Sequence, residues 1–421
     1  MTNSLTHQES FNTTEVLPVL GGARLARQVL WWCAAAWGLS SAPAAIAQAR
    51  FTPPAAQIVL PSSVHTANGQ RGALRDIEQA WRKAPKDLDA SLRYARAVFL
   101  IGLTEGDLRW YGSAKAALQP WWTATTLPAQ GYYLRALVRQ GFHDFQGGIQ
   151  DLNAAIAADP TQSEFWSWRF SLHLLTSNMA AARADCQEIE RRFGADEGNA
   201  CLATLLYRTG QAQRAVELLD VLVERPDFQG GSAQDWLRFH QGEAHRTLGQ
   251  NQRAIDIWEA HLKRRPETHG VRVALTDLLN QQGQFALAKR YAASKSPTDA
   301  LLVQALLASQ GLRDGETAAL AEQVEGRLQS QALRQETLIE RPQMIYMIRY
   351  GRHVAAGLTL AADNWTTQNE PADAVLLAEA ALHQKQPKAA EPVLRWMEKT
   401  GYTDPVLAPL AQQLKALLGR S

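Results

Sequence analysis

The stretch GEAHRTLGQNQRAIDIWEAHLKRRP, residues Gly242–Pro266, decides the fold of this chain. It has the pattern of two short helices joined by a tight turn. Small residues at Gly242 and Ala254 allow the two helices to approach closely, and Gly249 permits the sharp turn between them. Pro266 cannot continue a helix and ends the second one. The stretch therefore predicts a helical hairpin.

The same pattern recurs along the chain with a period of about 34 residues. The next unit, VRVALTDLLNQQGQFALAKRYAA, repeats the turn glycine at Gly283 and the small residue at Ala288. Weaker copies extend in both directions and predict roughly eight to ten hairpins. Residues 70–85 fit a second helix without a first helix before it. Because chance matches rarely persist in phase, adjacent units in phase indicate a helical repeat protein.

These positions match the signature of the tetratricopeptide-repeat superfamily, which the chain resembles strongly over residues 234–293 and moderately over most of the rest. The resemblance implies an all-α fold, a right-handed superhelical solenoid of helical hairpins over residues 70–421. More narrowly, three segments are similar to a group of exported bacterial repeat proteins: GDLRWYGSAKAALQPWW, RQGFHDFQGGIQDL and NWTTQNEPADAVLLAEAAL.

Composition excludes disorder and argues against a nucleic-acid partner. Hydrophobic residues make up 46% and charged residues 20% of the 421 positions, so the chain can bury a core. The 43 basic and 41 acidic residues give a formal net charge of +2. This balance offers no electrostatic case for binding a phosphate backbone, and we expect no nucleic acid among the partners.

The first 49 residues have the pattern of a targeting segment. Arg24 and Arg27 supply positive charge, the apolar run Val29–Leu39 is shorter than a membrane span, and small residues follow it. We expect a signal peptide with cleavage after Ala49, and the small-x-small pattern also permits cleavage after Ala47.

Such a leader predicts a periplasmic or secreted protein. The alternative is an uncleaved N-terminal anchor, which the long charged region containing Glu9 and Glu15 keeps open. Contact with the membrane is expected in that case alone. Residues 50–69 are rich in proline and lack helical periodicity, which predicts an N-terminal arm before the solenoid.

A solenoid of this kind has an extended concave face, which normally carries the binding surface. The superfamily resemblance implies that this face holds Tyr133, Tyr207, Arg208, Trp236, Phe239, Glu243, Arg246, Asp277, Asn280 and Gln281. Aromatic and charged side chains in one groove suit an extended segment of another envelope protein better than a glycan. The alternative is that these residues form an ordinary solvated helix face.

The predicted function is a periplasmic scaffold that binds a partner protein on its concave face. One alternative is an accessory role in the export or assembly of an envelope polysaccharide. Another is an enzyme with a site hidden in the groove, for which Glu243 and Asp277 are the candidate carboxylates.

We expect no catalytic site, cofactor or metal. His240, His245 and His261 are not spaced to put two metal ligands on one helical face. The sequence contains no glycine-rich phosphate loop and no Gly-x-Ser-x-Gly motif. Trp110 and Tyr111 fall in an apparent insertion, where aromatic side chains need not be buried in the core.

Cys186 and Cys201 remain after the leader, an even count that permits a disulfide in an exported protein. The repeat register places them on neighbouring hairpins, a second helix and the first helix that follows it. We therefore predict a disulfide between them. The alternative is two small buried residues that never meet.

Overall fold

The computed structural model describes residues 68–105, 109–294, 297–333 and 341–419. Within these ranges the chain forms α-helices and short 3-10 helices, and no strand occurs there. The prediction of an all-α fold is confirmed. The predicted leader and most of the predicted arm lie outside the described residues.

The first half of the fold consists of α2 (Asn68–Lys83), α3 (Leu88–Glu105), α4 (Arg109–Leu118), η1 (Gln119–Trp121), α5 (Ala129–Gly141), α6 (Phe145–Ala158), α7 (Ser163–Leu175), α8 (Met179–Phe193), α9 (Ala195–Arg208), α10 (Ala212–Leu222) and η2 (Pro226–Phe228). The second half consists of α11 (Gly231–Thr247), α12 (Asn251–Arg264), α13 (His269–Gln281), α14 (Phe285–Ala292), α15 (Asp299–Leu312), α16 (Thr317–Leu333), α17 (Arg341–Ile348), α18 (Val354–Trp365), α19 (Pro371–His383), η3 (Pro387–Ala390), α20 (Glu391–Thr400) and α21 (Leu407–Leu418).

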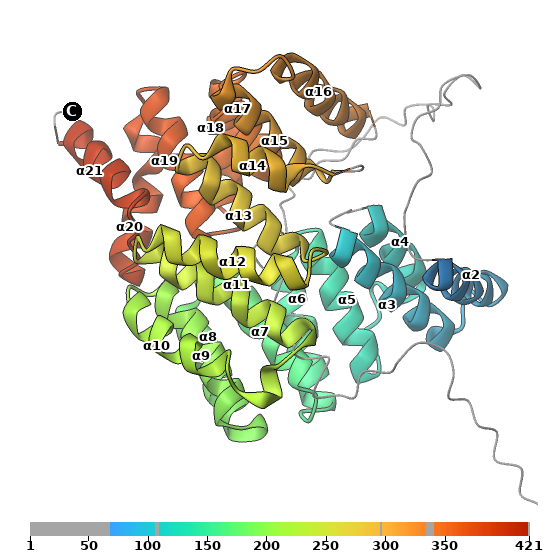
Figure 1. The fold of residues 1–421 in the computed structure, drawn as a ribbon. Coiled ribbons are helices and arrows are strands. Elements are labelled where there is room, and N and C mark those ends of the chain that lie inside the picture. The colour runs from blue at the N-terminus through green and yellow to red at the C-terminus, as the bar shows by residue number, and fades with distance from the viewer. Residues whose placement is uncertain (1–67, 106–108, 295–296, 334–340, 420–421) are drawn as a thin grey trace, which may run out of the picture.

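Successive helices pack as hairpins. Eight pairs run from α3–α4 to α17–α18, and α19 closes the series together with η3, α20 and α21 (Figure 1). Helix α2 packs on α3 and lies where a second helix is expected at residues 70–85. The residues before it lie outside the described ranges. The predicted solenoid of helical hairpins is confirmed.

Every hairpin from α5–α6 onward turns through one residue in the left-handed region of backbone space. These residues are His143, Ser177, Gly210, Gly249, Gly283, Arg313, Gly351 and Lys385, with φ between 53° and 85°. Successive members lie 30 to 39 residues apart. Because a left-handed residue lets the chain leave one helix and reverse within a few positions, these turns are the physical basis of the repeat.

The close helix approach predicted at Gly242 is explained by Trp258 on the facing helix. A Cβ atom at position 242 would lie 2.1 Å from Trp258 Nε1, too close for any real contact. Trp258 is fully buried, and its Nε1 donates a hydrogen bond to Phe239 O at 3.3 Å. Glycine is needed here because the indole of α12 fills the space that a side chain would take.

Trp110 and Tyr111 belong to helix α4 and not to a loop insertion. Tyr111 is buried and stacks on Phe99 with 5.0 Å between ring centroids. Trp110 packs against the same core from a partly buried position. The expectation that the core does not hold these aromatics is wrong for Tyr111, because α4 begins at Arg109 and places Tyr111 on its buried side.

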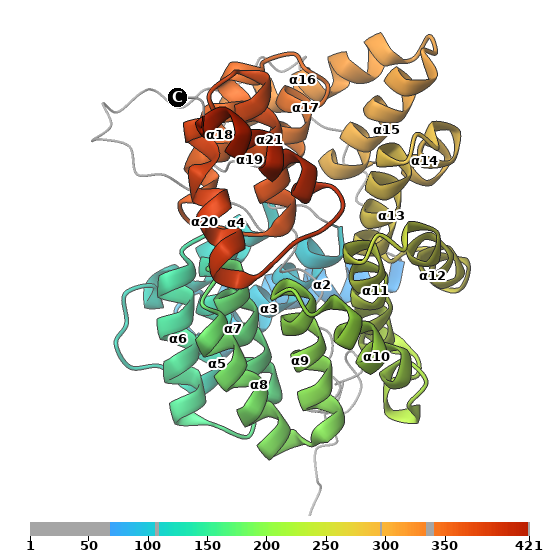
Figure 2. The ribbon, with the colours of Figure 1, turned by 90° about the vertical axis from the view of Figure 1, so that its left-hand side faces the viewer.

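The solenoid curls until its C-terminal helices lie against its middle repeats (Figures 1 and 2). The backbone N–H of Asn369 donates to Leu175 O at 2.8 Å, and Trp396 Nε1 donates to Ser177 Oγ at 2.8 Å. These bonds join the end of α7 to the loop before α19 and to α20. We call this junction between the hairpin turns of α5 to α12 and residues 341–405 the seam.

Four successive left-handed turn residues face the seam. Ser177 makes the bond to Trp396, and a Cβ atom added at Gly210 would lie 2.3 Å from Gly401 O. A Cβ atom at Gly249 would lie 3.0 Å from Pro405. Burial, with a smaller contribution from the positive charge of Arg341, holds the pKa of His143 well below its usual range.

The next four turns are open. A Cβ atom at Gly283 or Gly351 would have no described atom within 4 Å outside its own chain neighbours. Arg313 and Lys385 are exposed. The seam therefore covers four of the eight left-handed turns and leaves the other four open.

Cys186 on α8 and Cys201 on α9 meet in the core. Their Cα atoms are 5.4 Å apart and their Sγ atoms are at bonding distance. This separation lies within the range that a disulfide spans. The alternative that the two cysteines never meet is wrong, because α9 packs directly on α8.

We expect Gly210→Ala to destabilise the protein more than Gly283→Ala. Both residues have positive φ, so alanine strains each turn by on the order of 1 kcal/mol. At position 210 the methyl group must also displace the backbone of Gly401, which adds about 1–3 kcal/mol. Urea unfolding of both variants measures the difference, and equal losses would show that the seam contributes nothing to stability.

We expect the protein purified without reductant to contain a peptide in which Cys186 is linked to Cys201. Reduction should lower the free energy of unfolding by about 3 kcal/mol, because the bond closes a loop of about 15 residues. Mass spectrometry of a non-reduced digest and denaturation with and without reductant test both points. The double variant Cys186→Ala/Cys201→Ala is the control, since reductant should not change its stability. Two free thiols at these positions in the oxidised protein contradict the prediction.

Candidate partner-binding surface

The four aromatic residues predicted to line the concave face are buried. Tyr133, Tyr207, Trp236 and Phe239 are between 2% and 6% exposed. Tyr133 packs on Phe165 with 4.9 Å between ring centroids, because neighbouring first helices cover these positions as the hairpins stack. The expected aromatic groove is therefore corrected: in this structure these side chains belong to the core.

Arg208, the fifth predicted residue, takes part in the seam. Its Nη2 donates to Glu370 Oε1 at 2.6 Å, and the Arg341 guanidinium donates to Glu370 Oε2 at 2.9 Å. Arg341 also donates to both carboxylate oxygens of Asp373, at 2.9 and 3.0 Å. With Gln368, whose amide donates to Glu370 at 3.2 Å, these residues form a set that we call the closure cluster.

Burial and charge balance each other in the closure cluster. Burial alone would lower the pKa of Arg208, but Glu370 outweighs it and the pKa lies above its usual value. Burial raises the pKa of Asp373, and Arg341 offsets part of this effect. Two guanidinium groups therefore meet two carboxylates in a nearly dry site, where each charge needs its partner. The role of Arg208 is to hold the fold closed.

The remaining five predicted residues do lie together, along one wall formed by α11 and α13. Arg246 of α11 donates to Asp277 of α13 at 2.6 Å and to Gln281 at 3.1 Å. Gln281 donates to Asp277 at 2.9 Å, and Glu243 lies 3.5 Å from Arg246. Asn280 is the fifth member and extends the wall toward α15.

Three further residues complete this wall. Asn280 Nδ2 donates to Gln304 Oε1 of α15 at 2.8 Å. Arg349, just after α17, donates to Asp277 at 3.1 Å and to Glu379 of α19 at 2.9 Å. We call the eight residues Glu243, Arg246, Asp277, Asn280, Gln281, Gln304, Arg349 and Glu379 the inner charge cluster.

The inner charge cluster stays partly open to solvent. Side chains of its five charged members are between 18% and 26% exposed. Burial opposes the ionisation of Asp277, but Arg246 and Arg349 outweigh it and hold the pKa of Asp277 below its usual value. Burial raises the pKa of Glu243, and the offset from Arg246 is smaller.

Sequence reasoning missed Gln304, Arg349 and Glu379 because the repeat pattern fades in this part of the chain. One local signal was present. Arg208, Arg246 and Arg349 each lie within three residues before the left-handed glycine of their hairpin turn. The end of a first helix is thus a recurrent place for an inward-facing arginine in this protein.

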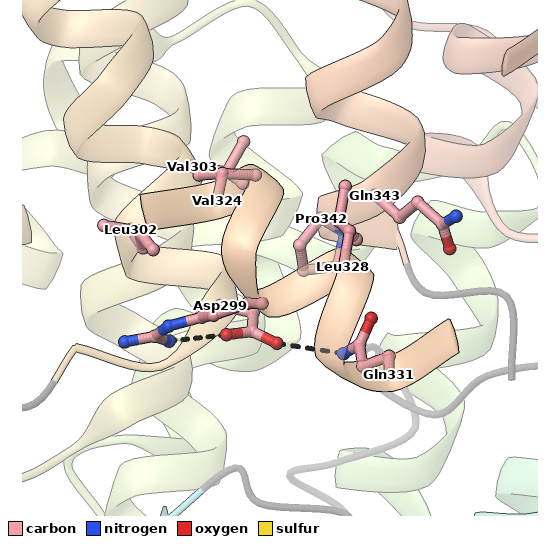
Figure 3. A pocket seen from close by; sticks show the side chains of 9 residues that line it. Asp299, Leu302, Val303, Val324, Leu328, Gln331, Pro342 and Gln343 are labelled. Carbon is pink, nitrogen blue, oxygen red and sulfur yellow. Dashed lines mark hydrogen bonds and ion pairs between the residues drawn. The ribbon is translucent and has the colours of Figure 1, made fainter. Parts of the chain in front are cut away.

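A small cavity between α15, α16 and α17 is structural (Figure 3). Its volume of about 10 Å³ is room for about one water molecule. The Asp299 carboxylate beside it accepts hydrogen bonds from Arg327 at 2.5 Å and from Gln331 at 3.2 Å. These bonds tie α16 to the start of α15 and leave no space for a larger ligand.

The three histidines considered as metal ligands serve the fold. His240 Nδ1 is 2.7 Å from Tyr207 Oη, and His245 Nδ1 is 2.5 Å from Gln250 Oε1. His261 Nε2 lies 3.1 Å from Thr268 Oγ1. Across the described part of the chain, no group of three or more metal-ligating side chains comes together. The same part of the chain contains no helix that is both long and apolar enough to cross a membrane.

No protein-family model matches the chain, and no curated protein matches it. Among solved structures it is similar to yeast Tom70, with a TM-score of 0.34 and 12% identity over 84% of this chain and 59% of that one. It is also similar to a Rap protein complexed with Competence and Sporulation Factor, with a TM-score of 0.43 and 12% identity over 82% and 93% of the two chains. A tetratricopeptide repeat protein from Parabacteroides merdae gives a TM-score of 0.31 and 14% identity over 68% and 98%.

The chain thus spans 59% of the length of Tom70. At these identities and TM-scores the likenesses say nothing about what the chain binds. The assignment of the fold rests on the helices and turns of the chain itself.

We expect Arg208→Ala to lower the free energy of unfolding by on the order of 3 kcal/mol, because it leaves two buried carboxylates with one cation. Arg191→Ala is the matched control, since Arg191 pairs with Glu188 on the exposed surface and should matter little. Urea unfolding measures both. Similar, small losses in the two variants would contradict the role given to the closure cluster.

Proposed function

We propose that this chain is an exported scaffold that holds a partner protein on its inner charge cluster. The proposal rests on the origin of the side chains in that cluster and on the partial exposure of its charged members. Its side chains come from five successive first helices or their ends, from α11 to α19, and those of its five charged members remain partly exposed while they bond to one another. A solenoid binds through such a continuous inner wall.

The cluster is organised before any partner arrives. Asp277 accepts hydrogen bonds from Arg246, Gln281 and Arg349, so that side chains from three segments are fixed on one carboxylate. Fixed side chains lose little conformational freedom when they bind, which favours affinity. An ordinary solvated helix face, the alternative considered above, would lack such cross-helix bonds.

The charge of the cluster indicates the chemistry of the partner. Three carboxylates, those of Glu243, Asp277 and Glu379, face two guanidinium groups, those of Arg246 and Arg349. Among the cluster's own residues this is an excess of one negative charge. Burial, which Arg246 and Arg208 only partly offset, raises the pKa of Glu243. A lysine or arginine side chain from a partner would neutralise that charge, so we propose a basic, extended segment as the bound element.

Two observations support the exported location within this proposal. The leader pattern lies in residues 1–49, outside the described residues. The paired Cys186 and Cys201 suit an oxidising compartment, because disulfides persist there and are rare in a reducing cytosol.

Site-specific crosslinking in the native host tests this function. We expect a photoreactive residue at position 280 or 281 to give the same protein adduct, because both positions belong to the inner charge cluster and neither substitution removes one of its carboxylates. A photoreactive residue at Glu217, exposed on α10, is the control and should give no such adduct. Raising the salt concentration from 0.1 to 0.5 M in lysates should reduce the yield, since screening weakens charge attraction between exposed groups.

Two outcomes would contradict the proposal. One is the absence of any adduct from positions 280 and 281. The other is an equal adduct from position 217, which would indicate random proximity rather than a binding wall.

A further inference from the structure

An open cleft of about 450 Å³ lies on the seam. Thr176 and Ser177 of the α7–α8 turn form one wall, and residues of α18, α19 and α20 form the others. This volume falls within the range of small-molecule sites in proteins, about 300–1,000 Å³. We call it the seam cleft. It is separate from the inner charge cluster, with which it shares no residue.

The body of the seam cleft is apolar and aromatic. Trp365 and Trp396 meet edge to face in it, with 5.5 Å between ring centroids and 89° between ring planes. The Trp396 ring is held in place by its bond to Ser177. Pro392 adds further apolar surface. Such a surface favours binding of the flat aromatic or aliphatic part of a ligand, which displaces water from the cleft.

The rim of the seam cleft is cationic. Arg395 and Lys399 line it from successive turns of α20, and both are exposed. The described residues that line the cleft include no aspartate or glutamate. Arg395 has an exposed carboxylate neighbour, Glu391, at 3.4 Å on the same helix, a contact that solvent weakens. The two cations therefore remain able to receive an anionic group.

The charge and the shape together specify one kind of ligand. We propose that the seam cleft binds a small amphipathic anion, an apolar body that carries one acidic head group. The head group lies at Arg395 and Lys399, and the body lies against Trp365 and Trp396. Because opposite walls of the cleft belong to the two sides of the seam, the bound molecule joins α7–α8 to the C-terminal helices.

Fluorescence titration with 8-anilinonaphthalene-1-sulfonate, an aryl sulfonate, tests the proposal. The full-length protein should bind it saturably at one site. The exposed double variant Arg395→Glu/Lys399→Glu should bind at least tenfold more weakly. Lys263→Glu/Arg264→Glu is the control, because it makes the same change of charge on exposed positions of α12 and should bind as the unmodified protein does.

Two further probes separate charge from shape. The neutral N-phenyl-1-naphthylamine should bind at least tenfold more weakly than the sulfonate, and inorganic phosphate should not compete with the sulfonate. Thr366→Trp places an indole in the cleft from an exposed position and should abolish binding without any change of charge. If the glutamate variant does not fold, as judged by circular dichroism, Arg395→Gln/Lys399→Gln replaces it with the same expectation.

The proposal is overturned if the unmodified protein shows no saturable binding. It is also overturned if charge reversal at Arg395 and Lys399 leaves the affinity unchanged, or if the neutral probe binds as tightly as the sulfonate. None of these results bears on crosslinking from the inner charge cluster, which lies elsewhere in the molecule.

Discussion

From α5–α6 onward, each hairpin reverses direction through a single left-handed residue, and this constraint shapes the molecule. The turn recurs every 30 to 39 residues from His143 to Lys385, so successive hairpins stack with a similar offset. Stacking with a constant offset bends the array, and the bend brings Asn369 to the end of α7 at Leu175. Four of these turns have two roles. They reverse the chain, and they also face the C-terminal helices.

The closure cluster and the inner charge cluster contain similar residues, but they differ in burial and therefore in role. Glu370 and Asp373 are almost fully buried beside Arg208 and Arg341, where a charge without a partner is very unfavourable. Asp277 and its arginines keep about a fifth of their side-chain surface. Identical chemistry thus closes the fold in one place and leaves a wall accessible in another. The difference comes from which helices cover the cluster.

Local features of this fold could be predicted from sequence, and contacts between distant repeats could not. Gly242 and Ala254 reveal the hairpin because both partners lie within one repeat, and Cys186 and Cys201 reveal a contact between adjacent hairpins. Arg208 and Glu370 are 162 positions apart, and no periodic pattern indicates that they meet. The aromatic positions were misplaced for a related reason, since the tight stacking of first helices, and not the residue type, decides their burial.

The bond between Ser177 and Trp396 joins positions 219 residues apart. Together with the other seam contacts, it closes a fold whose hairpins otherwise pack on their sequence neighbours. An open helical array has low contact order, can nucleate at any repeat and grows outward, so its ends fray independently of its centre. In a chain that closes on itself, the intervening repeats must fold and stack before the contacts between distant repeats can form. We therefore expect the seam contacts to form late in folding, and we expect loss of the last helices to weaken repeats in the middle of the sequence.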